Sequence, residues 1–148
     1  MHIPKGTTAE LELVTFRQAL QAANTPSPDY DIEKWIYAPN FYSEYRYILG
    51  TRGSHPLICI GINPSTAEPD NLDNTLKSVE RIALGNGFDS FIMFNVYAQR
   101  ATDPDAMEKE CNLLLHRKIW MPSVTFCLFR SIPRFGPHGV PLSKSGAI

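Results

Sequence analysis

The chain has 148 residues, of which 43% are hydrophobic and 20% charged, and its formal net charge is −1. This composition predicts one α/β domain over residues 1–148 and excludes a protein that coats duplex DNA by overall charge attraction. Three cysteines without paired spacing favour reduced thiols and indicate neither a disulfide framework nor a metal site. Without a signal pattern or a run approaching the roughly 20 apolar residues that span a bilayer, we expect a cytoplasmic protein that does not contact membranes.

The N-terminal region predicts a helix from about Thr8 to Ala23. Thr7 and Glu10 have the spacing of a capping box, and apolar residues recur at helical intervals after them. The two prolines within residues 24–29 should end this helix and form a surface connection.

Residues 35–47 are dense in aromatic side chains, and the alternation at 45–49 predicts a strand. Breaking residues at 50–54 suggest that this strand pairs antiparallel with its successor through a short turn. The aromatic rings could stack on nucleobases, but cross-strand and core packing is the commoner role of such residues.

The apolar run at residues 57–62 predicts a strand that is buried on both faces in the middle of a parallel sheet. A polar segment, residues 63–66, follows it directly. Open α/β sheets bind ligands where the carboxyl end of such a strand opens into a loop, so the candidate site is placed here.

A second strand is expected beside the first. Asp70 or Asp73 can cap a helix over residues 74–84, which should end at the glycines of 85–87. The apolar run at 91–96 then predicts a second buried strand, and strand, helix and strand together form a right-handed parallel crossover.

The polar loop at 97–104 should emerge at the same edge of the sheet as residues 63–66, so that the two loops face each other. A further helix is expected from Thr102 or Asp103 to about Trp120, and a last strand at 124–129. The domain core is expected over about residues 30–130. Residues 131–148 contain too many prolines and glycines for regular structure and predict an irregular tail.

The loop after the first buried strand supplies three candidate residues. Pro64 favours an extended conformation at Asn63, whose amide could position a catalytic water or bind the polar edge of a base. Asn63 could equally cap the following turn. Ser65 and Thr66 could bind an anion through backbone N–H groups and hydroxyls, or serve as ordinary turn caps.

Other candidates lie on the neighbouring elements. Asn95 ends the second strand much as Asn63 ends the first, and Arg100 could bind a phosphate or form a surface ion pair with Asp103 or Glu68. Asp73 is a candidate catalytic base, although capping the helix is its commoner role. His55 is expected to be exposed, and His138 could reach the site only if the tail folds.

Four ordered motifs stand out in the chain: Tyr45-Arg46-Tyr47, Gly61-Ile62-Asn63-Pro64-Ser65-Thr66-Ala67, Asp73-Asn74-Thr75 and the segment from Asn95 to Pro104. Through these motifs the chain resembles the bacterial domain of unknown function 1643 family, and the resemblance covers about residues 30–118. No established activity follows from it. Further on, the family's late Gly-x-Pro-x-His-Pro segment has only a distorted counterpart in residues 136–139.

Residues 61–64, Gly-Ile-Asn-Pro, are also similar to the first motif of mismatch-specific uracil-DNA glycosylases, with Ser65 in place of the motif's final glycine. This similarity implies a three-layer fold with a mainly parallel central sheet and flanking helices. It also implies that Asn63 positions the water that hydrolyses an N-glycosidic bond. A nucleobase, nucleotide or DNA substrate and no cofactor are therefore expected; the alternatives are a binding module without catalysis, or an inactive member with an incomplete C-terminus.

Overall fold

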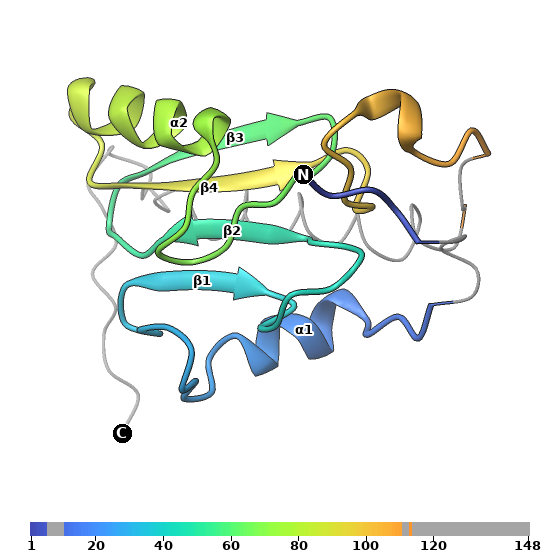
Figure 1. Ribbon diagram of the computed structural model, residues 1–148. Helices are drawn as coiled ribbons and strands as arrows, with labels where there is room; N and C mark the ends of the chain where they lie inside the picture. Colours follow the sequence, from blue (N-terminus) through green and yellow to red (C-terminus); the bar gives the residue numbers. More distant parts are fainter. Residues whose placement is uncertain (6–10, 111–112, 114–148) are drawn as a thin grey trace, which may run out of the picture.

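The computed structural model describes residues 1–5, 11–110 and 113 (Figure 1). This part of the chain is an α/β structure with a four-stranded mixed sheet in the order β1-β2-β4-β3. Strands β1 and β2 are antiparallel, β2 and β4 are antiparallel, and β3 and β4 are parallel. The strands are β1 (Trp35–Ala38), β2 (Ile48–Thr51), β3 (Pro56–Gly61) and β4 (Ser90–Asn95).

Helix α2 (Asn74–Gly85) connects β3 to its parallel neighbour β4, as the sequence predicts (Figure 1). Asp73 is the N-cap, and its side chain accepts a hydrogen bond of 2.9 Å from the Leu76 backbone N–H. Leu76 and Ala83 are buried on the inner face of this helix, whereas Ile82 is 53% exposed. Gly87 has a φ of 82°, which is the left-handed conformation expected after this helix.

Helix α1 (Phe16–Ala22) is shorter than the predicted helix, which should have begun near Thr8. Its capping box consists of Thr15 and Gln18. Val14 is not helical because its backbone is bonded elsewhere, with its N–H donating to the Tyr45 hydroxyl and its carbonyl accepting from the Tyr47 hydroxyl. Tertiary hydrogen bonds thus replace helical ones ahead of Phe16.

Strand β2 does not pair with its successor, which corrects the predicted hairpin between residues 45–49 and 57–62. It pairs with β4 instead, and Gly50 permits this approach because a Cβ there would lie 2.2 Å from the Phe91 carbonyl oxygen. Strand β3 therefore lies at an edge of the described sheet and is not in its middle. Ile60 is 56% exposed, so the prediction of burial on both faces is also wrong.

Alternating strand residues contribute to two separate apolar clusters, as expected for a sheet that is covered on both faces. Ile48 and Phe94 belong to the cluster that contains Phe16 of α1. Leu49 and Met93 belong to the cluster that contains Leu76 and Ala83 of α2.

The helix predicted from Thr102 or Asp103 to Trp120 is represented by η2 (Pro104–Ala106), a single 3-10 turn capped by Asp103. Residues 107–110 are not helical, and the Glu108 N–H donates to the Gln99 side chain at 3.0 Å. Leu113, farther along that predicted helix, is helical. The other residues of the predicted helix beyond residue 110, the strand at 124–129, the tail at 131–148 and His138 lie outside the described residues. Within the described residues, no helix is long and apolar enough to cross a membrane.

Candidate functional site

The loops that follow β3 and β4 face each other, as predicted from the crossover. The Tyr97 N–H donates to the Ile62 carbonyl at 2.8 Å, and the Ala101 N–H donates to the Pro64 carbonyl at 2.9 Å. Residues 62–67 and 97–102 are therefore joined along their length at the carboxyl ends of the two parallel strands, which is the region where such sheets bind ligands.

Asn63 joins these two loops through its side chain. Its Nδ2 donates to the Ala101 carbonyl at 2.8 Å and to the Pro64 carbonyl at 3.1 Å. Both amide hydrogens are thus engaged, while Oδ1 accepts no hydrogen bond from the described residues. The half-buried side chain is held in one orientation with its acceptor available.

The remaining predicted residues of the first loop are close by. The Ser65 hydroxyl lies 3.2 Å from the Thr102 hydroxyl, and Thr66 is half-buried. Asp73 serves as the cap of α2, and its carboxylate is also near enough to favour the charged form of Arg46.

Arg100 does not form the expected surface ion pair with Asp103 or Glu68. Its side chain is 0% exposed, because the backbone pairing that extends β2 and β4 turns it inward. The Nη1 atom donates to the carbonyls of Ser65 and Ala67, and Nη2 donates to the Tyr37 hydroxyl at 2.9 Å.

Arg46 is a second buried arginine on the same side of this pairing, and sequence reasoning did not select it. The Arg46 N–H donates to Ala98 and the Arg100 N–H to Glu44, which makes the two arginines diagonal neighbours. Both side chains donate to the same Ala67 carbonyl, Arg46 at 3.0 Å and Arg100 at 3.1 Å.

The electrostatic environment of this arginine pair, Arg46 and Arg100, is unfavourable. Burial, and then the nearby charge of Arg100, lowers the pKa of Arg46 to about 10. Asn95, which is 8% exposed, contributes only a long contact of 3.5 Å from its Oδ1 to Arg46 Nη2. Burial also raises the pKa of the Tyr37 hydroxyl to about 12, although Arg100 opposes this effect.

No carboxylate among the described residues forms an ion pair with either arginine. The two ion pairs found there join His2 to Glu44 and Lys34 to Asp70. The Nε atoms of Arg46 and Arg100 are buried and have no hydrogen-bond partner among the residues that the structure describes. The arginine pair therefore has two N–H donors without acceptors, and a positive charge without an ion-pair partner, among the described residues.

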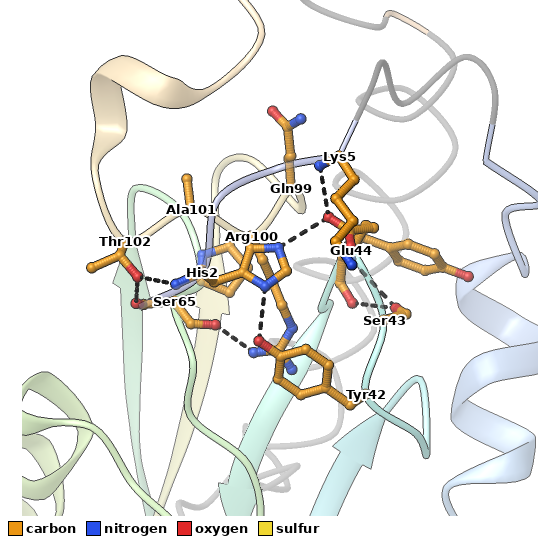
Figure 2. Close-up of polar contacts among 12 residues, drawn as sticks. His2, Lys5, Tyr42, Ser43, Glu44, Ser65, Gln99, Arg100, Ala101 and Thr102 are labelled. Atoms are coloured by element: carbon orange, nitrogen blue, oxygen red, sulfur yellow. Dashed lines mark hydrogen bonds and ion pairs between the residues drawn. The ribbon is translucent and has the colours of Figure 1, made fainter.

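A second group of polar residues lies on the outer side of Arg100 (Figure 2). His2 forms contacts through both ring nitrogens, with Tyr42 Oη at 2.9 Å from Nδ1 and with Glu44 Oε2 at 3.0 Å from Nε2. The Arg100 guanidinium lies 4.2 Å from the centre of the Tyr42 ring. Sequence reasoning missed these residues because no local motif relates His2 to partners some 40 positions away.

The N-terminal segment is held over this region by its backbone as well. His2 N–H donates to the Thr102 hydroxyl at 2.7 Å, and the Thr102 N–H donates to the His2 carbonyl at 3.0 Å. The segment borders a cavity of about 650 Å³, whose walls include His2, Tyr42 and Glu44. Among the described residues, no group of three or more His, Cys, Asp or Glu side chains could hold a metal ion.

Comparison with known proteins gives a family but no activity. No curated protein and no solved structure matches the chain. A family model described as "Protein of unknown function (DUF1643)" matches residues 46–122, just over half of the 148 residues. The matched region extends from Arg46 through β3, α2 and β4 to beyond Arg100, and so it includes the arginine pair and both facing loops. The chain therefore belongs to the DUF1643 family.

Proposed function

We propose that this protein binds a phosphorylated, nucleobase-containing ligand, and that Arg46 and Arg100 hold its anionic group. The observation that carries the proposal is the arginine pair itself, with two buried guanidinium groups, two unpartnered Nε atoms and no carboxylate partner among the described residues. Burying an uncompensated charge costs several kcal/mol, so proteins rarely keep one without a function.

A phosphate suits this position better than a neutral ligand. Guanidinium groups bind phosphate oxygens through short, charge-assisted hydrogen bonds, and two adjacent guanidinium groups match its double charge. The polar side chains expected to contact the rest of the ligand are those of Asn63, Asn95 and Tyr42. Amides can bind the polar edge of a base, and a half-exposed phenol ring can stack on it.

Binding can be tested by thermal unfolding in inorganic phosphate, uridine monophosphate and uridine, each at the same ionic strength set with sodium chloride. A ligand present at about ten times its Kd stabilises the folded state by about 1.4 kcal/mol, or about 3–5 °C for a domain of this size. We expect the monophosphate to raise the Tm most, phosphate less and uridine least. The exposed Arg81→Met variant is the control, and it should respond like the parent.

The arginine pair is tested by the same titration of Arg46→Met. The variant should lose the response to phosphate and to the monophosphate but unfold cooperatively. An equal response in parent and variant would remove Arg46 from the binding site, and no response to either anion in the parent would refute the proposal.

A more specific proposal is that the protein hydrolyses the N-glycosidic bond of the bound ligand. Its fold would then be the three-layer fold of the uracil-DNA glycosylase type. Its support is the motif at residues 61–64 together with the fixed Asn63 amide, whose Oδ1 is available to accept a hydrogen bond from a water molecule. Such a water could attack the sugar while donors near Ser65 stabilise the charge on the departing base. The competing proposal is a binding module that performs no chemistry.

A screen for free-base release distinguishes the two proposals. Its substrates are single- and double-stranded DNA containing uracil or mismatches, together with nucleosides and nucleotides. If hydrolysis occurs, the Asn63→Ala protein should bind the same substrate but release no base, and Asn74→Ala, an exposed position on α2, should behave like the parent. Binding by the parent without base release from any substrate would support the binding module.

A further inference from the structure

The side chains of Glu44, His2 and Tyr42 form a continuous hydrogen-bonded chain on the outer side of Arg100 (Figure 2). The Lys5 backbone N–H also donates to Glu44 Oε2, at 3.3 Å, and so helps to hold the carboxylate in place. This acid-base chain, defined as Glu44, His2 and Tyr42, comes before the part of the sequence that the family model matches.

The direction of the hydrogen bonds follows from the chemistry of the carboxylate. An ionised carboxylate can only accept, so the nitrogen that faces Glu44, Nε2 of His2, carries the hydrogen. In a neutral imidazole the other nitrogen, Nδ1, is then an acceptor, and it receives the hydroxyl hydrogen of Tyr42. This arrangement has the three parts of an activated hydroxyl: a hydroxyl, a base within hydrogen-bond distance, and a third group that orients the base.

All three side chains line the cavity of about 650 Å³. This volume lies within the range of pockets that bind small molecules. Apolar side chains, including Leu11 and Phe41, form part of the wall, and Lys5 and Ser43 add polar groups. A wall with both apolar and polar side chains suits a ligand that has a flat or apolar part and several hydroxyl groups.

Arg100 stabilises negative charge on the Tyr42 oxygen. Its guanidinium faces the ring at 4.2 Å from the centroid, so a phenolate that forms at Tyr42 would lie beside a buried positive charge. Burial has the opposite and larger effect, and it raises the pKa of Tyr42. The resting hydroxyl is therefore protonated and donates to His2 until a base removes its hydrogen.

We infer that Tyr42 is an acid-base residue for a hydroxylated ligand of nucleoside size in this cavity, with His2 as its base and Glu44 as a positioning residue. The ligand hydroxyl gives its proton to Tyr42 Oη as the Tyr42 proton moves to Nδ1 of His2. The resulting imidazolium is paired with the Glu44 carboxylate, and the ligand becomes an alkoxide in the cavity that Lys5 also lines. No electron transfer is involved, and the inference does not depend on an anion at the arginine pair.

The reactivity of Tyr42 can be measured without knowing the ligand, by labelling the protein with benzenesulfonyl fluoride. The Tyr42 oxygen bonds to sulfur, the sulfur–fluorine bond breaks, fluoride leaves, and the phenol proton passes to His2. Tyr97 is the internal control because both rings are 43% exposed. Mass spectrometry of digested protein gives both labelling rates in one sample.

We expect His2→Gln to reduce the ratio of the Tyr42 rate to the Tyr97 rate about a hundredfold, which is the lower end of what a positioned base contributes. Glu44→Gln should reduce this ratio partly, because a neutral amide orients His2 but cannot stabilise the imidazolium. The Tyr97 rate reports whether each variant remains folded. An unchanged ratio in folded His2→Gln would overturn the inference.

Discussion

Replacing Arg46 by methionine should stabilise the ligand-free protein, although a buried polar residue is lost. Lowering the pKa of Arg46 to about 10 corresponds to a penalty of about 3 kcal/mol for its charged form in the folded state. At pH 7 the guanidinium is charged both in the folded and in the unfolded chain, so the folded protein carries this whole penalty. Methionine has a similar length and no charge.

Losing the hydrogen bonds of Arg46 should lower the free energy of unfolding only slightly, because few of their acceptors are left without a donor. The Ala67 carbonyl still accepts from Arg100 at 3.1 Å, and the contact to Asn95 is 3.5 Å long and weak. The same change at Arg100 would leave the Ser65 carbonyl and the Tyr37 hydroxyl without that donor. We therefore expect Arg46→Met to gain about 1–3 kcal/mol and Arg100→Met to lose stability.

Urea denaturation at pH 7 in a low-salt buffer without phosphate measures this difference, and urea is preferred to guanidinium chloride because it adds no ions. The exposed Arg81→Met variant should change the unfolding free energy by no more than about 0.5 kcal/mol. A loss of about 1 kcal/mol or more in Arg46→Met, with an unchanged denaturant slope, would show that Arg46 stabilises the empty protein. The arginine pair would then stabilise the fold without a ligand, and its burial would not require a bound anion.

Three further changes test the fold that supports the site. Asp73→Ala removes the side chain that accepts from the Leu76 N–H and should cost at least about 1 kcal/mol in a urea titration; Asp73→Asn should cost less, because it keeps the cap and loses only the negative charge that favours charged Arg46. Gly50→Ala should cost at least about 3 kcal/mol or prevent folding, as judged by circular dichroism, because its Cβ would lie 2.2 Å from the Phe91 carbonyl oxygen. Hydrogen bonds from Ser54, Ser90 and His55 lower the pKa of Asp89, so the stability it provides is present at neutral pH and declines as acid protonates it. Tm measured against pH should therefore fall less steeply below pH 4 in Asp89→Asn, and an unchanged slope would contradict this.

The crossover of β3, α2 and β4 was predictable because each of its elements has a local signal. Apolar runs mark the two strands, Asp73 marks the start of the helix, and the glycines after it mark its end. The facing loops follow from parallel pairing alone. Nothing local, however, indicates that β2 lies between β1 and β4, since that order depends on the close approach of two backbones at Gly50.

The arginine pair illustrates a second kind of missing signal. A charged residue between Tyr45 and Tyr47 in a strand-like alternation is typical of a solvent-facing position, and an arginine in a polar loop is typical of the surface. Both are buried because residues 44–46 and 98–100 continue the pairing of β2 and β4 beyond the strands. These charges become buried only when the two segments pair in the sheet, so the sequence of either segment alone does not indicate the burial.

Arg100 connects the two proposed sites through its own charge. The N–H groups of its guanidinium donate to the Ser65 and Ala67 carbonyls and to the Tyr37 hydroxyl. The guanidinium also lies over the ring of Tyr42. The positive charge that would attract a phosphate is therefore the same charge that would stabilise a phenolate at Tyr42. An anion bound at the arginine pair would neutralise part of this charge and make Tyr42 a weaker acid, so occupancy of the inner site would reduce proton transfer in the outer cavity. Arg46, which lowers the pKa of Tyr42 less than Arg100 does, would transmit a smaller part of this effect.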